Sequence, residues 1–258
     1  MDGYDEGSYG AAFADVYDEW YQGISDIDAT IATLLGLARP GAAVLELAVG
    51  TGRLAVPLAE AGAATGITVT GIDASPEMLA RLATRDPGNL VATVLGDMVA
   101  DLPPGPFELA FVAYNSLFNL TGEGQQAACF AAVAERLTPG GRFVVEAFVP
   151  DVPFRDGDDI AVRTLSADRL VLSVTRNDAA AQSAIGQFVE LAGRPGEPAA
   201  VTLRPWAIRY RTPAQLDADA TAAGLVLDAR WEDFTRAEFT PESPRHVSVY
   251  RLSEAVAR

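Results

Sequence analysis

Hydrophobic and polar positions follow two alternating patterns along the first 150 residues. Short apolar runs cover 43–48, 67–72, 91–95, 107–113 and 142–148, and apolar residues have helical spacing in 26–37, 53–61, 76–84 and 124–137. Apolar runs of this length indicate buried strands, and apolar residues three and four positions apart indicate helices with one buried face. Because the two patterns alternate, they predict a doubly wound α/β fold with a mostly parallel sheet.

Further elements are predicted before, within and after this core. Helical spacing over 11–22 predicts a helix before the one at 26–37, and a helix from Thr212 to Gly224 is followed by strands near 225–232 and 246–251. An apolar period of two in 160–165, 169–176, 184–192 and 199–210, with turn signals at 167–168, 177–178 and 194–196, indicates an antiparallel β insert. We therefore expect N-terminal helices (1–40), a ligand-binding core (41–150), the β insert (160–210) and a segment that completes the core (211–258).

Composition excludes several classes of function. The chain has 35 acidic and 19 basic residues and a formal charge of -16, which repels phosphate backbones and anionic membranes, so neither nucleic acid nor membrane is expected as a partner. It contains no lysine, which excludes a P-loop lysine and a Schiff base. With a single cysteine, Cys129, and a single histidine, His246, it is expected to bind no metal. We find no signal peptide and no long apolar run, and we expect a cytoplasmic protein.

The loop after the first strand, in VLELAVGTGRLA, is the first candidate binding site. Gly50 and Gly52 allow the backbone to pass close to a ligand at the start of the next helix, although a glycine turn that only joins strand to helix is the alternative. GTGRLA also matches the dinucleotide pattern, so a nicotinamide-dependent oxidoreductase stays open. Glu46, however, would lie where a pyrophosphate binds. A carboxylate there repels phosphate and suits an ammonium group.

Two more acids follow the next two strands. Asp73, in GIDAS, can accept hydrogen bonds from both hydroxyls of a ribose, and Asp97, in LGDM, can accept one from the exocyclic amine of adenine. Each acid could instead cap a helix or lie in a solvated turn. Met78 could cover one face of the adenine or pack in the core. Three acids at three successive strand ends favour a cationic adenosyl ligand over a dinucleotide.

Residues 40–150 resemble the class I S-adenosylmethionine (SAM)-dependent methyltransferases. The matching segments are VLELAVGTG, GIDASPEML, GDM, FELAFVAYNSLFNL and LTPGGRFVVEAF, in that order. The resemblance implies a Rossmann-like seven-stranded sheet of order 3-2-1-4-5-7-6 with only strand seven antiparallel, and SAM as the cofactor with S-adenosylhomocysteine as the product. It places the cofactor against Glu46, Ala48, Gly50, Gly52, Arg53, Asp73, Ala74, Met78, Gly96, Asp97, Met98, Ala113 and Tyr114. Ala48 stands where glycine is commoner in the family.

The outer segments are similar to those of bacterial small-molecule methyltransferases typified by aminosugar N-methyltransferases. The resemblance implies that Tyr17, the first tyrosine of VYDEWY, reaches over the cofactor, that Tyr21 of the same segment also binds it, and that the β insert acts as a lid. Tyr17, Tyr114 and Asn115 become candidates for orienting the reacting groups, and the candidate acceptor contacts are Asn115, Phe118, Asn119, Phe188 and Trp206. Aromatic core packing is the alternative for the tyrosines. Asn119 stands where that subgroup can have a histidine.

The predicted function is methyl transfer from SAM to an oxygen or nitrogen of a small-molecule acceptor, in specialised metabolism. Such an SN2 transfer mainly needs a nucleophile held in line with the methyl group in a site that excludes water. An amine acceptor must only be neutral, whereas an alcohol or phenol gains from a general base, for which His246 is the only histidine. Besides the oxidoreductase, a SAM-binding protein without transferase activity stays open. The sequence leaves the acceptor and the oligomeric state undetermined.

Overall fold

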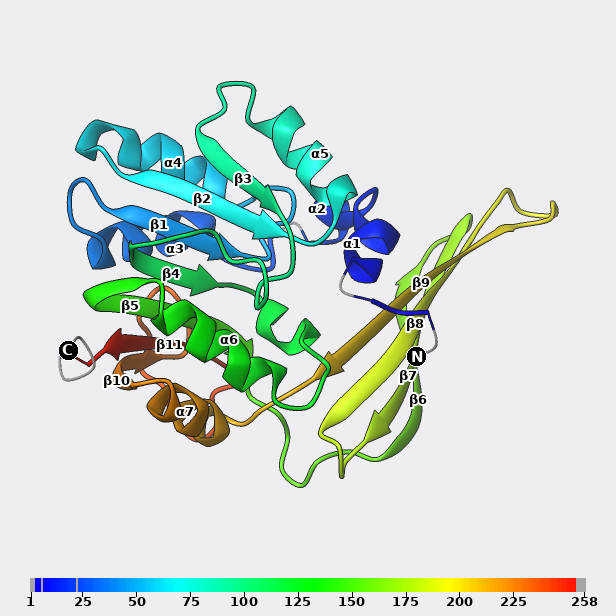
Figure 1. The fold of residues 1–258 in the computed structure, drawn as a ribbon. Coiled ribbons are helices and arrows are strands. Elements are labelled where there is room, and N and C mark those ends of the chain that lie inside the picture. Colours follow the sequence, from blue (N-terminus) through cyan, green and yellow to red (C-terminus); the bar gives the residue numbers. More distant parts are fainter. Residues whose placement is uncertain (1–2, 6, 22, 254–258) are drawn as a thin grey trace.

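A seven-stranded mixed sheet forms the centre of the molecule (Figure 1). The computed structural model describes residues 3–5, 7–21 and 23–253. In spatial order the strands are β3 (Val91–Leu95), β2 (Thr68–Asp73), β1 (Ala43–Leu47), β4 (Phe107–Val112), β5 (Leu137–Phe148), β11 (Arg245–Leu252) and β10 (Leu225–Trp231). Only β11 runs against its neighbours. The predicted order 3-2-1-4-5-7-6 is therefore confirmed.

Helices cover both faces of this sheet and form two separate cores. One face packs against α3 (Ile27–Leu37), α4 (Ala55–Gly62) and α5 (Pro76–Arg85), and the other against α6 (Gln125–Ala134) and α7 (Pro213–Ala222). The 3-10 helices η1 (Ala63–Thr65) and η2 (Ser116–Asn119) lie in connecting loops. Asp26 caps α3, and Thr212 forms a capping box with Gln215 at the start of α7. Both caps are visible in the sequence. No helix in the described ranges is long and apolar enough to cross a membrane.

The β insert is a second sheet, a four-stranded antiparallel meander of β6 (Gly157–Leu165), β7 (Arg169–Asp178), β8 (Ser183–Ala192) and β9 (Ala200–Arg209). In Figure 1 it projects from the central sheet on the side where α1 lies. The predicted turn at 177–178 is wrong, because both residues continue β7 and the chain reverses over 179–182, where the Asp178 carboxylate accepts a hydrogen bond from Ala181 N–H. The helix predicted over 124–137 ends at Ala134, because Leu137 already pairs with Phe107 in the sheet.

The predicted helix over 11–22 is also wrong: two short helices, α1 (Ser8–Phe13) and α2 (Tyr17–Trp20), occupy this part of the chain, and residue 22 lies outside the described residues. In a continuous helix the Ala12 carbonyl would accept the Val16 N–H. Here Val16 N–H donates to Phe13 O at 3.0 Å, and the Ala12 carbonyl accepts from the Arg204 guanidinium of β9. A contact with the insert thus replaces a helical hydrogen bond.

Candidate cofactor site

A cavity of about 250 Å³ lies at the carboxyl ends of the parallel strands, where ligands of doubly wound sheets bind. Residues of α1, α2 and the segment before them contribute to its wall from one side. Predicted site residues that line it are Tyr17, Ala48, Gly50, Asp73, Ala74, Met78, Gly96, Asp97, Met98 and Asn119. The cavity therefore brings together predicted residues from Tyr17 to Asn119, about a hundred positions apart in the sequence.

The loop after β1 is bonded to the end of β2 through Asp73. Gly50 N–H donates to Asp73 Oδ2 at 2.8 Å, and Ser75 N–H donates to Asp73 Oδ1 at 2.9 Å. Burial raises the pKa of Asp73, and these two N–H groups act in the opposite direction. Each carboxylate oxygen can accept a second hydrogen bond from the cavity. Ala48 has a φ of 51°, a left-handed conformation that glycine adopts more easily.

Glu46 is a buried carboxylate beside this loop. Its exposed fraction is 4%, and Oε2 has no hydrogen-bond partner among the described residues. Burial raises the pKa of Glu46 well above its usual value, while the charge of Arg53 lowers it. An unsatisfied buried acceptor costs stability, so this oxygen is suited to a hydrogen-bond donor supplied by a ligand.

Asp97 and two methionines form the part of the wall beyond β3. Asp97 accepts hydrogen bonds from Val99 N–H at 2.9 Å and Ala100 N–H at 2.8 Å. Both bonds end on Oδ1, so the turn does not occupy the second oxygen. Met78 and Met98 are buried side chains that give this wall an apolar surface. The combination suits a flat heterocycle that carries an amino group.

Tyrosines from the N-terminal segment cover the cavity. Tyr9 and Tyr21 share a hydrogen bond of 2.9 Å between their hydroxyls. The ring centroid of Tyr21 lies 4.7 Å from that of Tyr17 and 5.6 Å from that of Tyr114. Burial raises the pKa of Tyr4 to about 12 and also raises the pKa values of Tyr9 and Tyr17. These phenols stay protonated at neutral pH and can serve as hydrogen-bond donors.

A strained segment follows β4 next to this cover. Tyr114 and Asn115 have φ values of 47° and 65°, which non-glycine residues rarely adopt. Glu146 of β5 holds them: its Oε2 accepts from Tyr114 N–H at 2.8 Å, and its carbonyl accepts from Asn115 N–H at 3.1 Å. Asn115 Oδ1 in turn accepts from Phe148 N–H at 2.6 Å. Local strain of this kind is concentrated at functional sites.

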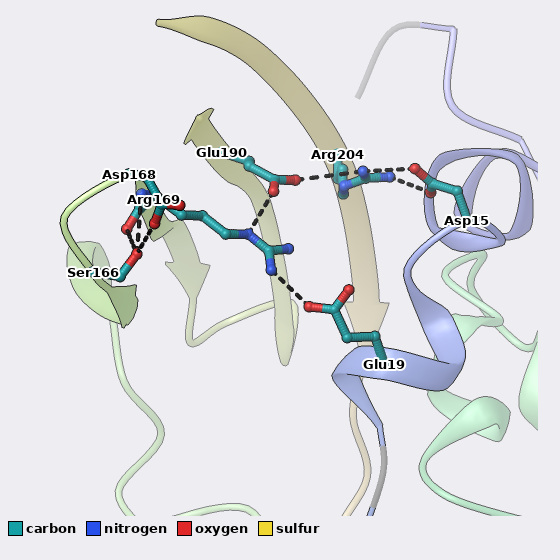
Figure 2. Close-up of polar contacts among 7 residues, drawn as sticks. All are labelled: Asp15, Glu19, Ser166, Asp168, Arg169, Glu190 and Arg204. Atoms are coloured by element: carbon teal, nitrogen blue, oxygen red, sulfur yellow. Dashed lines mark hydrogen bonds and ion pairs between the residues drawn. The ribbon is translucent and has the colours of Figure 1, made fainter. Parts of the chain in front are cut away.

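The β insert is tied to the cover by charged and aromatic contacts. Figure 2 shows Arg204 of β9 bound to Asp15 at 2.6 and 2.9 Å, and Arg169 of β7 bound to Glu19 at 2.6 Å. Glu190 lies between the two arginines, 2.7 Å from Arg169 Nε and 3.5 Å from Arg204 Nη2. Because Asp15 precedes α2 and Glu19 lies within it, this network fixes the helix that carries Tyr17, a residue of the cavity wall.

Several other predicted residues lie outside the cavity lining. Phe188 and Trp206 pack with Phe13 and Trp20 between the insert and α1–α2. Phe118 is fully buried in the core. The remaining ones are Tyr21, Glu46, Gly52, Arg53, Ala113, Tyr114 and Asn115, which lie in or next to the loops that surround the cavity.

His246 does not line this cavity, so it is not placed to act as a base there. It lies in β11 opposite Ala147, its Nδ1 is 2.8 Å from Ser248 Oγ, and burial lowers its pKa to about 4. Within the described part of the chain, no three His, Cys, Asp or Glu side chains are grouped as a metal site would require.

Some wall residues were missed by the sequence reasoning. Tyr4, Tyr9, Gly10, Ser116, Leu120, Thr121, Gly122 and Gln125 line the cavity. No sequence motif distinguishes them, because it is the tertiary fold that brings their segments to the cavity. Glu146 was also missed, although an acid inside the apolar run 142–148 is a visible signal of a buried polar role.

Comparison with known proteins assigns this fold and cavity to one family. Residues 44–141 match the methyltransferase domain family. The CcbJ methyltransferase of Streptomyces caelestis has 37% identity and a TM-score of 0.86, over 97% of this chain and 100% of that one. The cypemycin N-terminal methyltransferase of a Streptomyces species is 30% identical over 58% of this chain and 60% of its own length. An uncharacterized methyltransferase from Synechocystis is 35% identical over 41% of this chain and 47% of its own.

The chain thus spans about half the length of the curated relatives it matches, and the whole of the CcbJ structure. It belongs to the class I SAM-dependent methyltransferase family, whose cofactor is SAM.

Proposed function

We propose that this protein transfers the methyl group of SAM to a nitrogen atom of a small-molecule acceptor in specialised metabolism. The observation that carries the proposal is that Asp73 and Asp97, from successive strand ends, line one cavity beneath a cover of tyrosines, with the buried Glu46 carboxylate beside the loop that borders it.

The residues of the cavity fit an adenosyl sulfonium. Asp73 would accept hydrogen bonds from the ribose hydroxyls, Asp97 Oδ2 from the adenine amino group, and Glu46 Oε2 from the methionyl ammonium. A dinucleotide would instead bring its pyrophosphate close to the Glu46 carboxylate, which repels phosphate. The nicotinamide-dependent alternative is therefore disfavoured on electrostatic grounds.

The side chains around the cavity need to exclude water and orient the acceptor. Bound SAM supplies an electrophilic methyl group with a good leaving group. Tyr17 and Tyr21 cover the site, and the hydrogen bonds of Glu146 fix the backbone of Tyr114 and Asn115, so that the acceptor meets rigid walls. The side-chain oxygen of Asn115 is held by Phe148 N–H, which makes its amide nitrogen the group that can donate to an acceptor.

Nitrogen is favoured over oxygen because the cavity offers no suitable base. Its described lining residues include no histidine or cysteine, and the tyrosines have raised pKa values. Of the three carboxylates in the lining, Asp73 and Asp97 would be taken by the cofactor, and the lowered pKa of Asp5, caused by its hydrogen bond with Ser8, makes Asp5 a weak base. An alcohol would need a base to accept its proton, whereas an amine attacks as the free base and releases a proton to water afterwards. The name of the cypemycin relative, an N-terminal methyltransferase, supports the same acceptor atom.

The test is a panel of amines, each paired with the alcohol of the same skeleton. The panel contains a short peptide with a free N-terminus, a cyclic secondary amine and an aminosugar. We expect S-adenosylhomocysteine and a methylated product with at least one amine, a rate that rises as the pH approaches the amine pKa, and no turnover of its alcohol partner. Preferential methylation of an alcohol would refute the nitrogen assignment. Tight SAM binding without turnover of any acceptor, including cell-extract metabolites, would instead indicate a SAM-binding protein.

A further inference from the structure

A second cavity, of about 200 Å³, lies at the same edge of the central sheet as the cofactor cavity. Its lining comes from the start of α3, from the loop between β10 and β11, from Arg245 at the amino end of β11 and from Glu146 near the carboxyl end of β5. Because β11 is antiparallel to β5, these two strand ends meet at one edge. The lining shares no described residue with that of the cofactor cavity, and we call it the second cavity.

Glu146 lines the second cavity and has one carboxylate oxygen without a protein partner. The residue is 7% exposed. Its Oε2 accepts a hydrogen bond from Tyr114 N–H at 2.8 Å, whereas no residue in the described ranges donates to Oε1. Burial raises the pKa of Glu146, as expected for a carboxylate that is largely removed from water. Oε1 is therefore suited to a hydrogen-bond donor that a ligand supplies.

Charge favours a cation as the occupant of the second cavity. The described lining residues include three carboxylates, those of Asp26, Glu146 and Asp233, and one guanidinium, that of Arg245. Arg245 is bound to Asp233 at 3.3 Å, and Asp26 caps α3 by accepting Ala29 N–H at 2.9 Å. The two groups that would attract an anion, the guanidinium and the amino end of the helix, therefore already have partners.

Two contacts join the second cavity to the cofactor site. Arg53, which follows the loop after β1, donates from Nη1 to Oγ of Ser25, a lining residue, at 2.7 Å. The charge of Arg53 lowers the pKa values of both Glu46 and Glu146, because the guanidinium lies near each carboxylate. The second contact is the bond from Tyr114 N–H to Glu146. A ligand in the second cavity would thus lie beside the end of the cofactor site where Glu46 would bind the methionyl ammonium.

We propose that the second cavity binds the amine of the acceptor and that Glu146 Oε1 accepts a hydrogen bond from its nitrogen. The inference rests on the proposed function and adds the substrate class, an amine that is a cation at neutral pH. Since a water molecule takes up about 30 Å³, the cavity has room for roughly six heavy atoms of the acceptor. A small aliphatic or cyclic amine meets these requirements.

The same contact would assist the transfer. The nitrogen lone pair forms the N–C bond while the C–S bond of the sulfonium breaks, so that the positive charge moves from sulfur to nitrogen. The Glu146 carboxylate would stabilise this charge in the ammonium product, which later releases its proton to water. The ether formed from an alcohol would carry no charge for the carboxylate to stabilise.

Cysteine labelling measures binding in the second cavity without turnover. Ile24 lines the cavity, so the thiol of Ile24→Cys should react with methyl methanethiosulfonate, while the native Cys129 is fully buried. With S-adenosylhomocysteine present, we expect about 10 mM piperidine to slow this reaction at least threefold, as an affinity in the low millimolar range implies. Its neutral isostere tetrahydropyran and the anion acetate should have no effect. Labelling of Leu90→Cys, an exposed position before β3, should not respond to piperidine.

Glu146→Gln removes the charge and keeps an oxygen for Tyr114 N–H. In the Ile24→Cys background, we expect it to abolish the protection by piperidine. Glu108→Gln is the matched control, because the Glu108 side chain is 14% exposed and lies on the neighbouring strand β4, bound to Arg39 at the opposite end of the sheet. This control should keep the protection. Thermal melting and SAM affinity, unchanged within about twofold in both variants, would show that the fold and the cofactor site are intact.

The outcomes separate this inference from the proposed function. Protection by piperidine that requires Glu146 supports the inference even if no amine is methylated, a result that would refute only the proposed function. If an amine is methylated, Glu146→Gln should raise its KM at least tenfold, since a charge-assisted hydrogen bond is lost. An unchanged KM would leave the proposed function intact and overturn the inference. No protection by piperidine, equal protection by tetrahydropyran or acetate, or protection that survives Glu146→Gln would also overturn it.

Discussion

Replacement of Arg204 by methionine tests whether the β insert fixes the helices that cover the cofactor cavity. The Arg204 side chain is 7% exposed and makes two hydrogen bonds to Asp15 and one to the Ala12 carbonyl. Hydrogen bonds to charged groups contribute about 1.5–3 kcal/mol. Asp15 is 59% exposed and regains water in the variant, and Glu190 keeps its bond to Arg169, so we expect the lower half of that range, about 2 kcal/mol.

Arg176→Met is the matched control. Arg176 of β7 makes the same two-pronged contact with Asp158 at 2.7 and 3.0 Å, but its side chain is 70% exposed and it joins only strands within the insert. An exposed pair contributes less than about 1 kcal/mol. Both variants lose one positive charge and keep an apolar stem, so that the comparison isolates burial and the link to α1 and α2.

Hydrogen exchange detected by mass spectrometry, together with urea unfolding, distinguishes the two variants. A loss of about 2 kcal/mol lowers the equilibrium constant for docking of α1 and α2 on the β insert roughly thirtyfold, because each 1.4 kcal/mol changes an equilibrium constant tenfold. We expect amides of 8–21 to exchange faster in Arg204→Met and to stay unchanged in Arg176→Met. Equal effects in the two variants, or faster exchange confined to the insert, would refute the reasoning that Arg204 clamps the cover.

Two further predictions concern protons and metals. Burial, and then the charge of Arg230, lowers the pKa of His246 from 6.5 to about 4 in the folded protein. Between these two pH values the unfolded chain binds a proton that the folded protein does not, so protonation favours unfolding. The neutral His246 therefore contributes about 3 kcal/mol to the free energy of unfolding above pH 6.5, and this contribution is lost as the pH falls to 4. Urea unfolding at several pH values should show this loss in the wild type relative to His246→Gln, and parallel curves would contradict it. Methyl transfer should survive excess EDTA, since no metal-like cluster occurs in the described ranges, and a loss that Mg²⁺ restores would disprove metal independence.

The central fold could be predicted because its signals are local and repeated. Apolar runs and helical spacing place strands such as β1 and β2 within one or two residues of their bounds, and Asp26 and Thr212 mark helix starts through their caps. The sheet order came from the family resemblance, since local patterns carry no information about which strands are neighbours.

The N-terminal helices show why the rest could not be predicted. The break between α1 and α2 depends on Arg204, nearly two hundred residues away, which takes the Ala12 carbonyl. Phe188 and Trp206 have the alternation expected of a sheet face, but only the tertiary structure decides that this face meets Phe13 and Trp20. The residues of the cavity wall between Ser116 and Gln125 likewise carry no motif.

Calorimetric titration of SAM into Asp73→Asn, beside wild type and Asp86→Asn, tests the central claim most directly. Asp73 is half-buried and Asp86 is buried, and each accepts two backbone N–H groups, but of the two only Asp73 lines the cavity. We expect Asp73→Asn to weaken SAM binding at least tenfold, about 1.4 kcal/mol or more, and Asp86→Asn to leave it within about twofold. Unchanged SAM affinity in a folded Asp73→Asn protein, or a wild type that binds NAD⁺ and not SAM, would contradict the account.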